Sequence, residues 1–246
     1  QRMEPLPPAQ RLLRVLVVAD PAADARLPGA EEEGNAVADL LETFNLITPT
    51  KNRIEVVRLI GPTEATRTAV LQQLLTRSYD VLHFAGHCIY NTEKPAASGW
   101  IFTGGALLTA NEIQRIDRVP ALVVSNACES GITPDRSGER AAALAPTFAE
   151  TFFARGVANF ICTAWPVGDR EARDFALALY ADLLGLTFKP PAERVGLRFE
   201  SQYYEAGQPQ PIFRAMRNAR RAIADLTYDR HSWGAYQHYG NPYARL

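Results

Sequence analysis

The sequence predicts an α/β fold, a three-layer sandwich in which a mostly parallel sheet of about six strands lies between two layers of helices. Apolar, β-branched runs of strand length alternate with longer segments whose apolar residues recur at helical spacing. Parallel strands need long crossover connections, usually helices, so this alternation indicates a parallel sheet covered on both faces. The chain shows no internal repeat and is expected to form one domain, residues 11–246, after a polar, proline-rich linker at residues 1–10.

Each expected strand is a short apolar run that stops at turn residues. The first ends at Asp20-Pro21 and the second at Gly61-Pro62. The tail is rich in aromatic residues and is expected to add a sixth strand. The expected strands cover residues 11–20, 53–60, 80–86, 121–127 and 157–165, with the sixth inside 233–243.

Helices are expected between and after the strands. The first begins in an acidic stretch, and Thr63 and Thr109 are expected to cap the second and third. Gly156 and Gly185 are expected to end the fourth and fifth. The expected helices cover residues 28–44, 63–79, 107–116, 140–156, 170–185 and 211–226, and a polar, proline-rich insertion occupies residues 187–211.

The composition is that of a globular protein with no excess of either charge. Among 246 residues, 26 are basic and 27 are acidic, which gives a net charge of −1. This balance argues against nucleic acid or an anionic membrane as the partner, and the basic cluster at 214–226 is expected to be a solvated helix face. No apolar stretch is long enough to span a membrane. Three cysteines, a small and odd number, indicate a reducing compartment, and we expect the chain to be cytoplasmic.

Two polar motifs lie at the ends of predicted strands. "HFAGH" (residues 83–87) ends the third strand, and "SNACESG" (125–131) ends the fourth. In open α/β sheets, functional sites lie outside the carboxyl ends of the strands. If these two strands are neighbours, His87 and Cys128 share one crevice. A histidine beside a cysteine can take the thiol proton and return it to a leaving amine, which is the chemistry of nucleophilic catalysis.

Other interpretations of these residues are structural. A cysteine after a strand is more often a small buried hydrophobe, and Cys162 is expected in the core. His83, His87, Cys88 and Cys128 are suitable metal ligands, but residues 83 and 87 of one strand stand about 13 Å apart and no paired motif frames a zinc site, so no metal is expected. The loop after the first strand lacks the glycines of a nucleotide site.

Five motifs follow one another in a fixed order: "HFAGH", "GWIFTGGALLTANEI", "NACESG", "GVANFICTAWPVGD" and "WGAYQHYGNP". Together they resemble the CHAT domain, a member of the caspase-like clan of cysteine proteases, with caspases, separase, legumain and gingipain as relatives. The resemblance covers residues 12–243 and implies a caspase-like α/β sandwich with a Cys–His dyad. It assigns the base to His87 and the nucleophile to Cys128, and it leaves His83 a structural residue.

The family usually has a glycine after the catalytic histidine, and the backbone amide of that glycine helps to form the oxyanion hole. This sequence has Cys88 there. Because the backbone amide survives the change, the resemblance implies an oxyanion hole made by the amides of Cys88 and Cys128. The Cys88 side chain must then find room beside the site.

The resemblance also suggests which peptide bond the site cuts. Leu27 stands where caspases have the arginine that reads aspartate, with Arg26 beside it. Glu129, Trp165 and Asp169 match positions that supply the substrate pocket in legumain and gingipain. An acidic pocket favours arginine or lysine before the scissile bond. Glu129 and Asp169 have a second interpretation, as an acid and a cap at helix N-termini.

The expected function is that of a cysteine endopeptidase that cleaves a specific partner protein, after a basic residue, without a metal or organic cofactor. Gln1 suggests a piece of a longer polypeptide, and the family implies fused sensor or repeat modules that regulate the site. The insertion offers Lys189, Arg194 and Arg198 as places of self-cleavage. The alternative is a catalytically silent caspase-like scaffold that binds partners.

Overall fold

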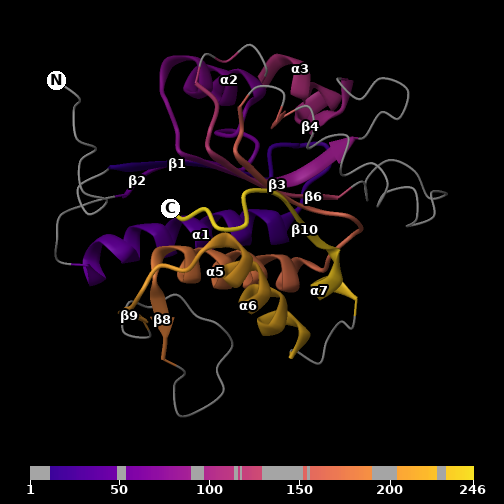
Figure 1. Ribbon diagram of the computed structural model, residues 1–246. Helices are drawn as coiled ribbons and strands as arrows, with labels where there is room; N and C mark the ends of the chain where they lie inside the picture. Colours follow the sequence, from indigo (N-terminus) through magenta and orange to yellow (C-terminus); the bar gives the residue numbers. More distant parts are fainter. Residues whose placement is uncertain are drawn as a thin grey trace, which may run out of the picture.

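A computed structural model shows a central sheet between two helical layers (Figure 1). It describes residues 12–48, 54–89, 97–113, 116, 118–128, 152–153, 156–189, 204–225 and 231–246. Helices α1, α5 and α6 lie on one side of the sheet, and helices α2 and α3 lie on the other. This arrangement confirms the α/β class and the three layers expected from the alternation of strands and helices.

The main sheet has eight strands in the described part of the chain, and six of them follow the order β10-β7-β6-β3-β1-β2. The five strands β7, β6, β3, β1 and β2 are parallel. β10 pairs antiparallel with β7, so the sixth strand expected in the tail is confirmed. β4 and β5 extend the end of β3, while β8 and β9 form a separate hairpin. The strands are β1 (Leu13–Ala19), β2 (Ile54–Ile60), β3 (Val81–Ile89), β4 (Gly99–Ile101), β5 (Leu107–Thr109), β6 (Leu122–Cys128), β7 (Asn159–Thr163), β8 (Leu186–Phe188), β9 (Tyr204–Ala206) and β10 (Tyr236–Gly240).

The strand order changes direction between β1 and β3. The chain passes from β1 to the edge strand β2 and then returns to β3 on the other side of β1. Open α/β sheets bind their ligands at such a switch point, outside the carboxyl ends of the strands. The helices with printed bounds are α1 (Pro28–Ile47), α2 (Arg67–Thr76), α3 (Ala110–Ile113), α5 (Asp169–Leu184), α6 (Ile212–Ala224) and α7 (Ser232–Ala235).

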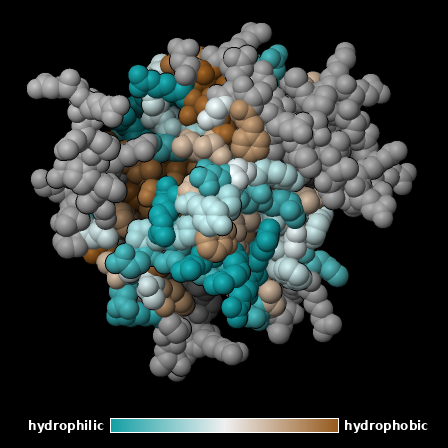
Figure 2. All heavy atoms as spheres, in the orientation of Figure 1, coloured by the Kyte–Doolittle hydropathy of each residue, from teal (hydrophilic) through white to brown (hydrophobic). Residues whose placement is uncertain are grey.

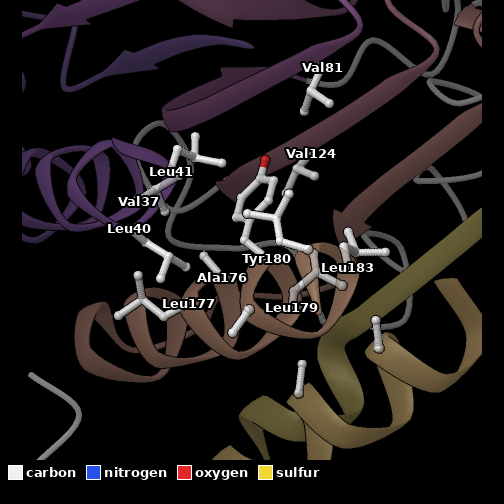
Figure 3. Close-up of a cluster of buried hydrophobic side chains, with 14 of the residues drawn as sticks. Val37, Leu40, Leu41, Val81, Val124, Ala176, Leu177, Leu179, Tyr180 and Leu183 are labelled. Atoms are coloured by element: carbon white, nitrogen blue, oxygen red, sulfur yellow. The ribbon is translucent and has the colours of Figure 1, made fainter. Parts of the chain in front are cut away.

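The larger core cluster lies between the sheet and the helices α1 and α5. Figure 3 shows side chains from both helices and from β3 and β6 that converge around Tyr180. Removing each such valine or leucine side chain from water contributes about 1.5–3 kcal/mol. The α1 members recur at helical spacing, as the sequence pattern predicted. The labelled members are Val37, Leu40, Leu41, Val81, Val124, Ala176, Leu177, Leu179, Tyr180 and Leu183.

An aromatic cluster covers the opposite face of the sheet. The rings of Phe84 and Trp100 are stacked, with centroids 4.4 Å apart and an interplanar angle of 8°. Trp100 is fully buried, and its Nε1 donates a hydrogen bond to the Ser125 hydroxyl at 3.0 Å. Phe152 and Phe160 continue the cluster. These contacts tie the short strand β4 to β3 and β6.

Helix α2 begins later than expected. The prediction of a helix over 63–79, capped by Thr63, is wrong at its start, because Thr66 is the N-cap and accepts a hydrogen bond from the Ala69 amide at 3.1 Å. The preceding residues form a turn in which the Ala65 amide donates to the Gly61 carbonyl at 2.8 Å. Both threonines are good caps by type, and this turn decides between them.

The helix expected over 107–116 is also different. Its first three residues form β5, and the four-residue helix α3 follows in the described residues. Thr109 nevertheless caps α3, because its hydroxyl accepts from the Glu112 amide at 3.3 Å while the Glu112 carboxylate accepts from the Thr109 amide at 3.0 Å. This is a capping box. The prediction that a helix begins at Thr109 is therefore confirmed. Residues 107–109 form a strand because they pair with β4.

Both strands that carry the candidate dyad are longer than predicted. β3 continues to Ile89, because its last two residues pair with β4, and β6 continues to Cys128. Cys128, which directly follows the strand expected over 121–127, is thus itself a strand residue. The extension places His87 and Cys128 inside the hydrogen-bonded sheet.

Several segments expected from the sequence lie outside the described residues. These are the linker at 1–10, most of the helix expected over 140–156, and residues 190–203 of the insertion. The two ends of the insertion pair as β8 and β9. Gly185 ends α5 in the left-handed conformation, with φ of 71°, as expected for a C-cap glycine.

Helix α6 has one apolar and one basic face. Ile212, Met216 and Ala219 are buried, whereas Arg214 and Arg217 are exposed. Figure 2 shows hydrophilic residues gathered over this lower part of the molecule. The basic cluster is a solvated helix face in this structure. No helix in the described ranges is long and apolar enough to cross a bilayer.

Candidate active site

His87 and Cys128 are partners in the parallel ladder between β3 and β6. Seven residue pairs are in register, from Val81 opposite Leu122 to His87 opposite Cys128. Neighbouring strands lie about 4.8 Å apart, so the backbones of the two residues are adjacent at the carboxyl end of the sheet. The two strands are thus neighbours, as the shared crevice required. The side chain of Cys128 lies outside the described part of the chain.

The His87 imidazole is oriented by a backbone carbonyl. His87 is 8% exposed, and its Nε2 lies 3.0 Å from the Ala25 carbonyl oxygen. A carbonyl oxygen only accepts hydrogen bonds, so Nε2 carries the proton and Nδ1 of the neutral ring carries a lone pair. Nδ1 is buried, and none of the described residues donates to it. A general base needs such a lone pair.

Ala25 belongs to the loop of residues 20–27, which connects β1 to α1. Asp20 begins this loop in the left-handed conformation, with φ of 48°, which costs on the order of 1–3 kcal/mol in a residue other than glycine. The Asp20 side chain is buried, and it accepts hydrogen bonds from the Leu27 amide at 2.8 Å and from Arg26 Nε at 2.5 Å. The hydrogen bond to Asp20 is the main reason that the pKa of the Arg26 guanidinium is raised.

The turn between β4 and β5 supports the same loop from another side. The Thr103 hydroxyl accepts from the Ala23 amide at 3.0 Å and donates to the Pro21 carbonyl at 3.1 Å. The Gly104 amide donates to the Asp24 carboxylate at 3.2 Å. Gly104 has φ of 73°, which suits the tight turn between these strands. The loop that orients His87 is therefore fixed at both of its halves.

The Cys88 side chain lies on the opposite face of the sheet from His87, because successive strand residues point to opposite faces. Cys88 is buried in the aromatic cluster, and its thiol donates to the Ala127 carbonyl at 3.2 Å. Its backbone pairs with Trp100 across the β3–β4 ladder. The role of the Cys88 amide as an oxyanion donor stays a prediction.

Alkylation is expected to distinguish Cys128 from the other two cysteines. Burial raises the pKa of the Cys162 thiol to about 12, so at pH 8 only about one molecule in ten thousand carries the reactive thiolate. Cys88 is 2% exposed and its thiol is hydrogen-bonded. We expect iodoacetamide at pH 8 to modify the folded chain once, as measured by intact mass, and Cys128→Ala to abolish the modification. Equal labelling of Cys128→Ala would contradict this.

A cavity of about 150 Å³ lies beside the strand ends. Its walls come from the start of α1, from β3 and β6, and from residues 163–172. An apolar cavity of this volume holds a benzene molecule in another protein, so the space suits one substrate side chain. The described lining residues are Leu27, Gly29, Ala30, Glu33, Gly86, Asn126, Thr163, Pro166, Val167, Asp169, Ala172 and Tyr236.

The cavity is rich in hydrogen-bond acceptors. Glu33 and Asp169 contribute carboxylates. Asn126 Nδ2 donates to Glu33 Oε1 at 2.5 Å and to the Ala172 carbonyl at 3.4 Å, which leaves Asn126 Oδ1 as an acceptor. Asn126 Oδ1 and Thr163 Oγ1 are buried, and neither has a hydrogen-bond partner among the described residues. This lining matches a cationic group that carries several N–H donors.

His83 supports Glu33 from beneath the cavity. Glu33 Oε1 lies 3.0 Å from His83 Nε2, and the Tyr180 hydroxyl lies 3.3 Å from His83 Nδ1. Burial raises the pKa of Tyr180 well above its usual value, so its hydroxyl keeps its proton and donates to Nδ1. His83 Nε2 is in close contact with the carboxylate but makes no hydrogen bond of good geometry to any described residue. His83 thus takes part in a buried chain of contacts that orients Glu33.

The three pocket residues expected from the sequence have different positions. Asp169 lines the cavity and is the first residue of α5, whereas Gly168 occupies the cap position without a side-chain bond. The Asp169 carboxyl group packs so closely on Gly29 that a Cβ atom at residue 29 would collide with it. Trp165 is not among the lining residues, and its ring packs against α7. Glu129 lies outside the described residues.

Four residues of the site, Asp20, Ala25, Glu33 and Asn126, were not predicted from the sequence. Only Glu33 gave a readable signal, because it lies four residues before Val37 and thus on the apolar face of α1, where an acid is unusual. Its burial at 2% exposure follows from that position.

Comparison with known proteins gives a family and a fold. The family model of the CHAT domain matches residues 2–241. No curated protein sequence matches the chain. The solved structure of gingipain R, an arginine-specific cysteine proteinase, is similar over 96% of this chain, at 11% identity and a TM-score of 0.55. A complex of the pro- and mature domains of the same Porphyromonas gingivalis enzyme gives 0.57 over 96% at 11% identity.

A further solved structure, described only as a protease, gives a TM-score of 0.56 over 97% of this chain at 14% identity. The chain spans 47%, 48% and 49% of these three chains, about half their length. At such identities the solved structures establish the fold, and the family match, which extends over nearly the whole sequence, establishes the lineage. The chain therefore belongs to the CHAT domain family and has the caspase-like fold.

Proposed function

We propose that this chain is a cysteine endopeptidase domain that cleaves a partner protein after a basic residue. One observation carries the proposal: His87, with a buried lone pair on Nδ1, is the register partner of Cys128 at the carboxyl end of the sheet. Register partners on neighbouring strands share a face of a sheet as a general rule. A base and a nucleophile so placed are the parts that thiol proteolysis requires.

In the proposed reaction, His87 Nδ1 takes the proton of the Cys128 thiol, and the sulfur attacks the scissile carbonyl carbon. The carbonyl electron pair moves to its oxygen, which the backbone amides of Cys88 and Cys128 would stabilise. The oxyanion then collapses, the carbon–nitrogen bond breaks, and His87 returns the proton to the departing amine. Water hydrolyses the resulting thioester and frees Cys128. The chemistry calls for no metal or organic cofactor.

The acceptor-rich cavity supports the preference for arginine or lysine. Gly86 and Asn126 line it, and they stand one and two residues before the proposed base and nucleophile. A side chain in the cavity would thus belong to the residue adjoining the scissile bond. In this proposal, Glu33 and Asp169 bind the charged end of the substrate side chain, and Glu129 is a further acid of the pocket. Trp165 supports the neighbouring wall of the cavity.

A panel of fluorogenic peptides that differ only in the residue before the scissile bond tests the proposal. We expect turnover after arginine and lysine, little after leucine, and none with Cys128→Ala. Turnover after aspartate with none after basic residues would refute the specificity. An active-site probe that reacts equally with wild type and Cys128→Ala would refute the protease and favour the scaffold function.

Neutralising the buried pocket carboxylate is expected to weaken selectivity. Glu33→Gln keeps an oxygen for Asn126 but removes the charge, and a hydrogen bond to a charged group contributes about 1.5–3 kcal/mol. We therefore expect kcat/KM for an arginine peptide to fall roughly 10- to 150-fold, with a smaller fall for a leucine peptide. Asp169 is exposed, so Asp169→Asn should cost about 1 kcal/mol or less of transition-state stabilisation with the arginine peptide. Glu32→Gln, one residue away on the solvent side of α1, is the matched control.

The remaining parts of the proposal concern the protein around this chain. We propose a cytoplasmic, reducing location, because three cysteines do not form a disulfide framework. We propose that fused sensor or repeat modules regulate the site. Self-cleavage at Lys189, Arg194 or Arg198 would appear as two fragments in the wild-type chain and one intact chain in Cys128→Ala.

A further inference from the structure

The inference concerns what holds the His87 ring in its reactive orientation, and it relies on the proposed function for the role of His87. The ring is fixed by a single described hydrogen bond, from Nε2 to the Ala25 carbonyl at 3.0 Å. A backbone carbonyl is only as well placed as the loop that carries it. The path of residues 20–27 therefore decides where the lone pair of Nδ1 points.

Asp20 holds both ends of this loop, in addition to the contacts that Thr103 and Gly104 make with its middle. Its amide donates to the Ala85 carbonyl at 2.9 Å and so continues the pairing of β1 with β3, two residues before His87. Its carboxylate, 1% exposed, holds the far end of the loop through the Leu27 amide and the Arg26 guanidinium. Asp20 thus connects β3, the strand that carries His87, to the two residues that follow Ala25.

The conformation of Asp20 supports a functional reading. It is the one residue other than glycine with positive φ in the described chain. A strained residue persists only when its surroundings hold it there, and such residues cluster at functional sites. Here the left-handed turn sends the chain out of β1 at the switch point, so that the loop returns over the end of β3. We infer that Asp20, clamped by Arg26, is a positioning residue for the base His87.

The experiment compares three variants with wild type. Asp20→Asn keeps an oxygen for the Leu27 amide and a side chain that tolerates the left-handed conformation, but it presents an N–H group to Arg26. Arg26→Gln removes the cation and leaves Asp20 intact, and because Arg26 is 45% exposed it tests the clamp if Asp20→Asn does not fold. Asp39→Asn is the matched control, since it removes an acid of α1 from an exposed ion pair with Arg58, away from the loop.

The first readout is kinetic. A misplacement of about 1 Å costs about 100-fold in rate, so Asp20→Asn should lower kcat roughly 10- to 100-fold, with KM little changed. Arg26→Gln should act in the same direction, and Asp39→Asn should stay within about twofold. Full activity in both clamp variants would overturn the inference.

The second readout does not need activity. Nitrogen NMR of the histidine rings in a Cys128→Ala background should show His87 with its proton on Nε2, assigned by His87→Gln. Asp20→Asn and Arg26→Gln should give His87 a mixture of tautomers while His83 and His238 stay unchanged. A single Nε2–H tautomer in both clamp variants would overturn the inference, even if their kinetics change. If the chain has no peptidase activity, the proposed function is refuted. The NMR measurement of the His87 tautomer would still decide whether Asp20 positions the ring.

Discussion

Cys128→Ala is expected to lower kcat/KM for the best peptide by at least roughly 10⁴-fold, because the variant has no nucleophile to form the thioester. His87→Ala should cost a similar factor, since it removes the proposed general base from the register partner of Cys128. The two residues act as a unit, so the double variant should be no worse than either single one. Initial rates with an arginine peptide, at matched enzyme concentrations, measure all three.

Cys162→Ala is the control for the loss of a thiol. Cys162 lies within β7 and is buried, so its replacement should leave kcat/KM within about twofold while it lowers stability modestly. Retention of more than a tenth of the activity by Cys128→Ala would show that another group attacks the substrate. Additive losses in the double variant would show that His87 and Cys128 act in separate steps.

Trp100→Ala is expected to have the largest effect on stability among the variants considered. Trp100 is fully buried, stacks on Phe84 and donates to the Ser125 hydroxyl. Replacing a core tryptophan with alanine costs about 3–5 kcal/mol through lost burial and the cavity it leaves. The Ser125 hydroxyl, itself buried, would also lose its partner, at a further cost of about 1 kcal/mol or more. Urea unfolding of the folded chain measures the change in the free energy of unfolding.

Two further variants separate these contributions. Trp100→Phe keeps a ring over Phe84 and loses the hydrogen bond, so its cost should be well below that of alanine. Trp233→Ala, at a position 48% exposed, should change the free energy of unfolding by about 1 kcal/mol or less. Equal losses for Trp100→Ala and Trp233→Ala would show that the aromatic cluster does not stabilise the sheet.

Long elements with a clear pattern could be predicted from the sequence to within a few residues. β2 and α5 are examples, because a β-branched run or a helical repeat carries its own signal. The three-residue strands β4, β5, β8 and β9 could not be predicted in the same way. Each forms only because a partner segment lies beside it, and three residues are too few for a pattern.

The residues of the candidate site also differ in whether a local sequence pattern identifies them. His87 and Cys128 could be selected because each ends an apolar run at the edge of the sheet where chemistry occurs. Ala25 could not be selected, because every residue has a carbonyl group and only the path of the loop makes this one useful. Asp20 could be recognised as a turn residue, but its left-handed conformation and its contact with Arg26 needed coordinates.

The ladder between β3 and β6 has a consequence for how this chain can diverge. Its seven rungs set the level at which His87 meets Cys128, and a slip of one rung would turn every side chain of one strand to the other face. Apolar residues along these strands can be exchanged for one another at modest cost. An inserted or deleted codon within either strand would part the two residues at once, so length variation in this lineage should be confined to the connecting segments.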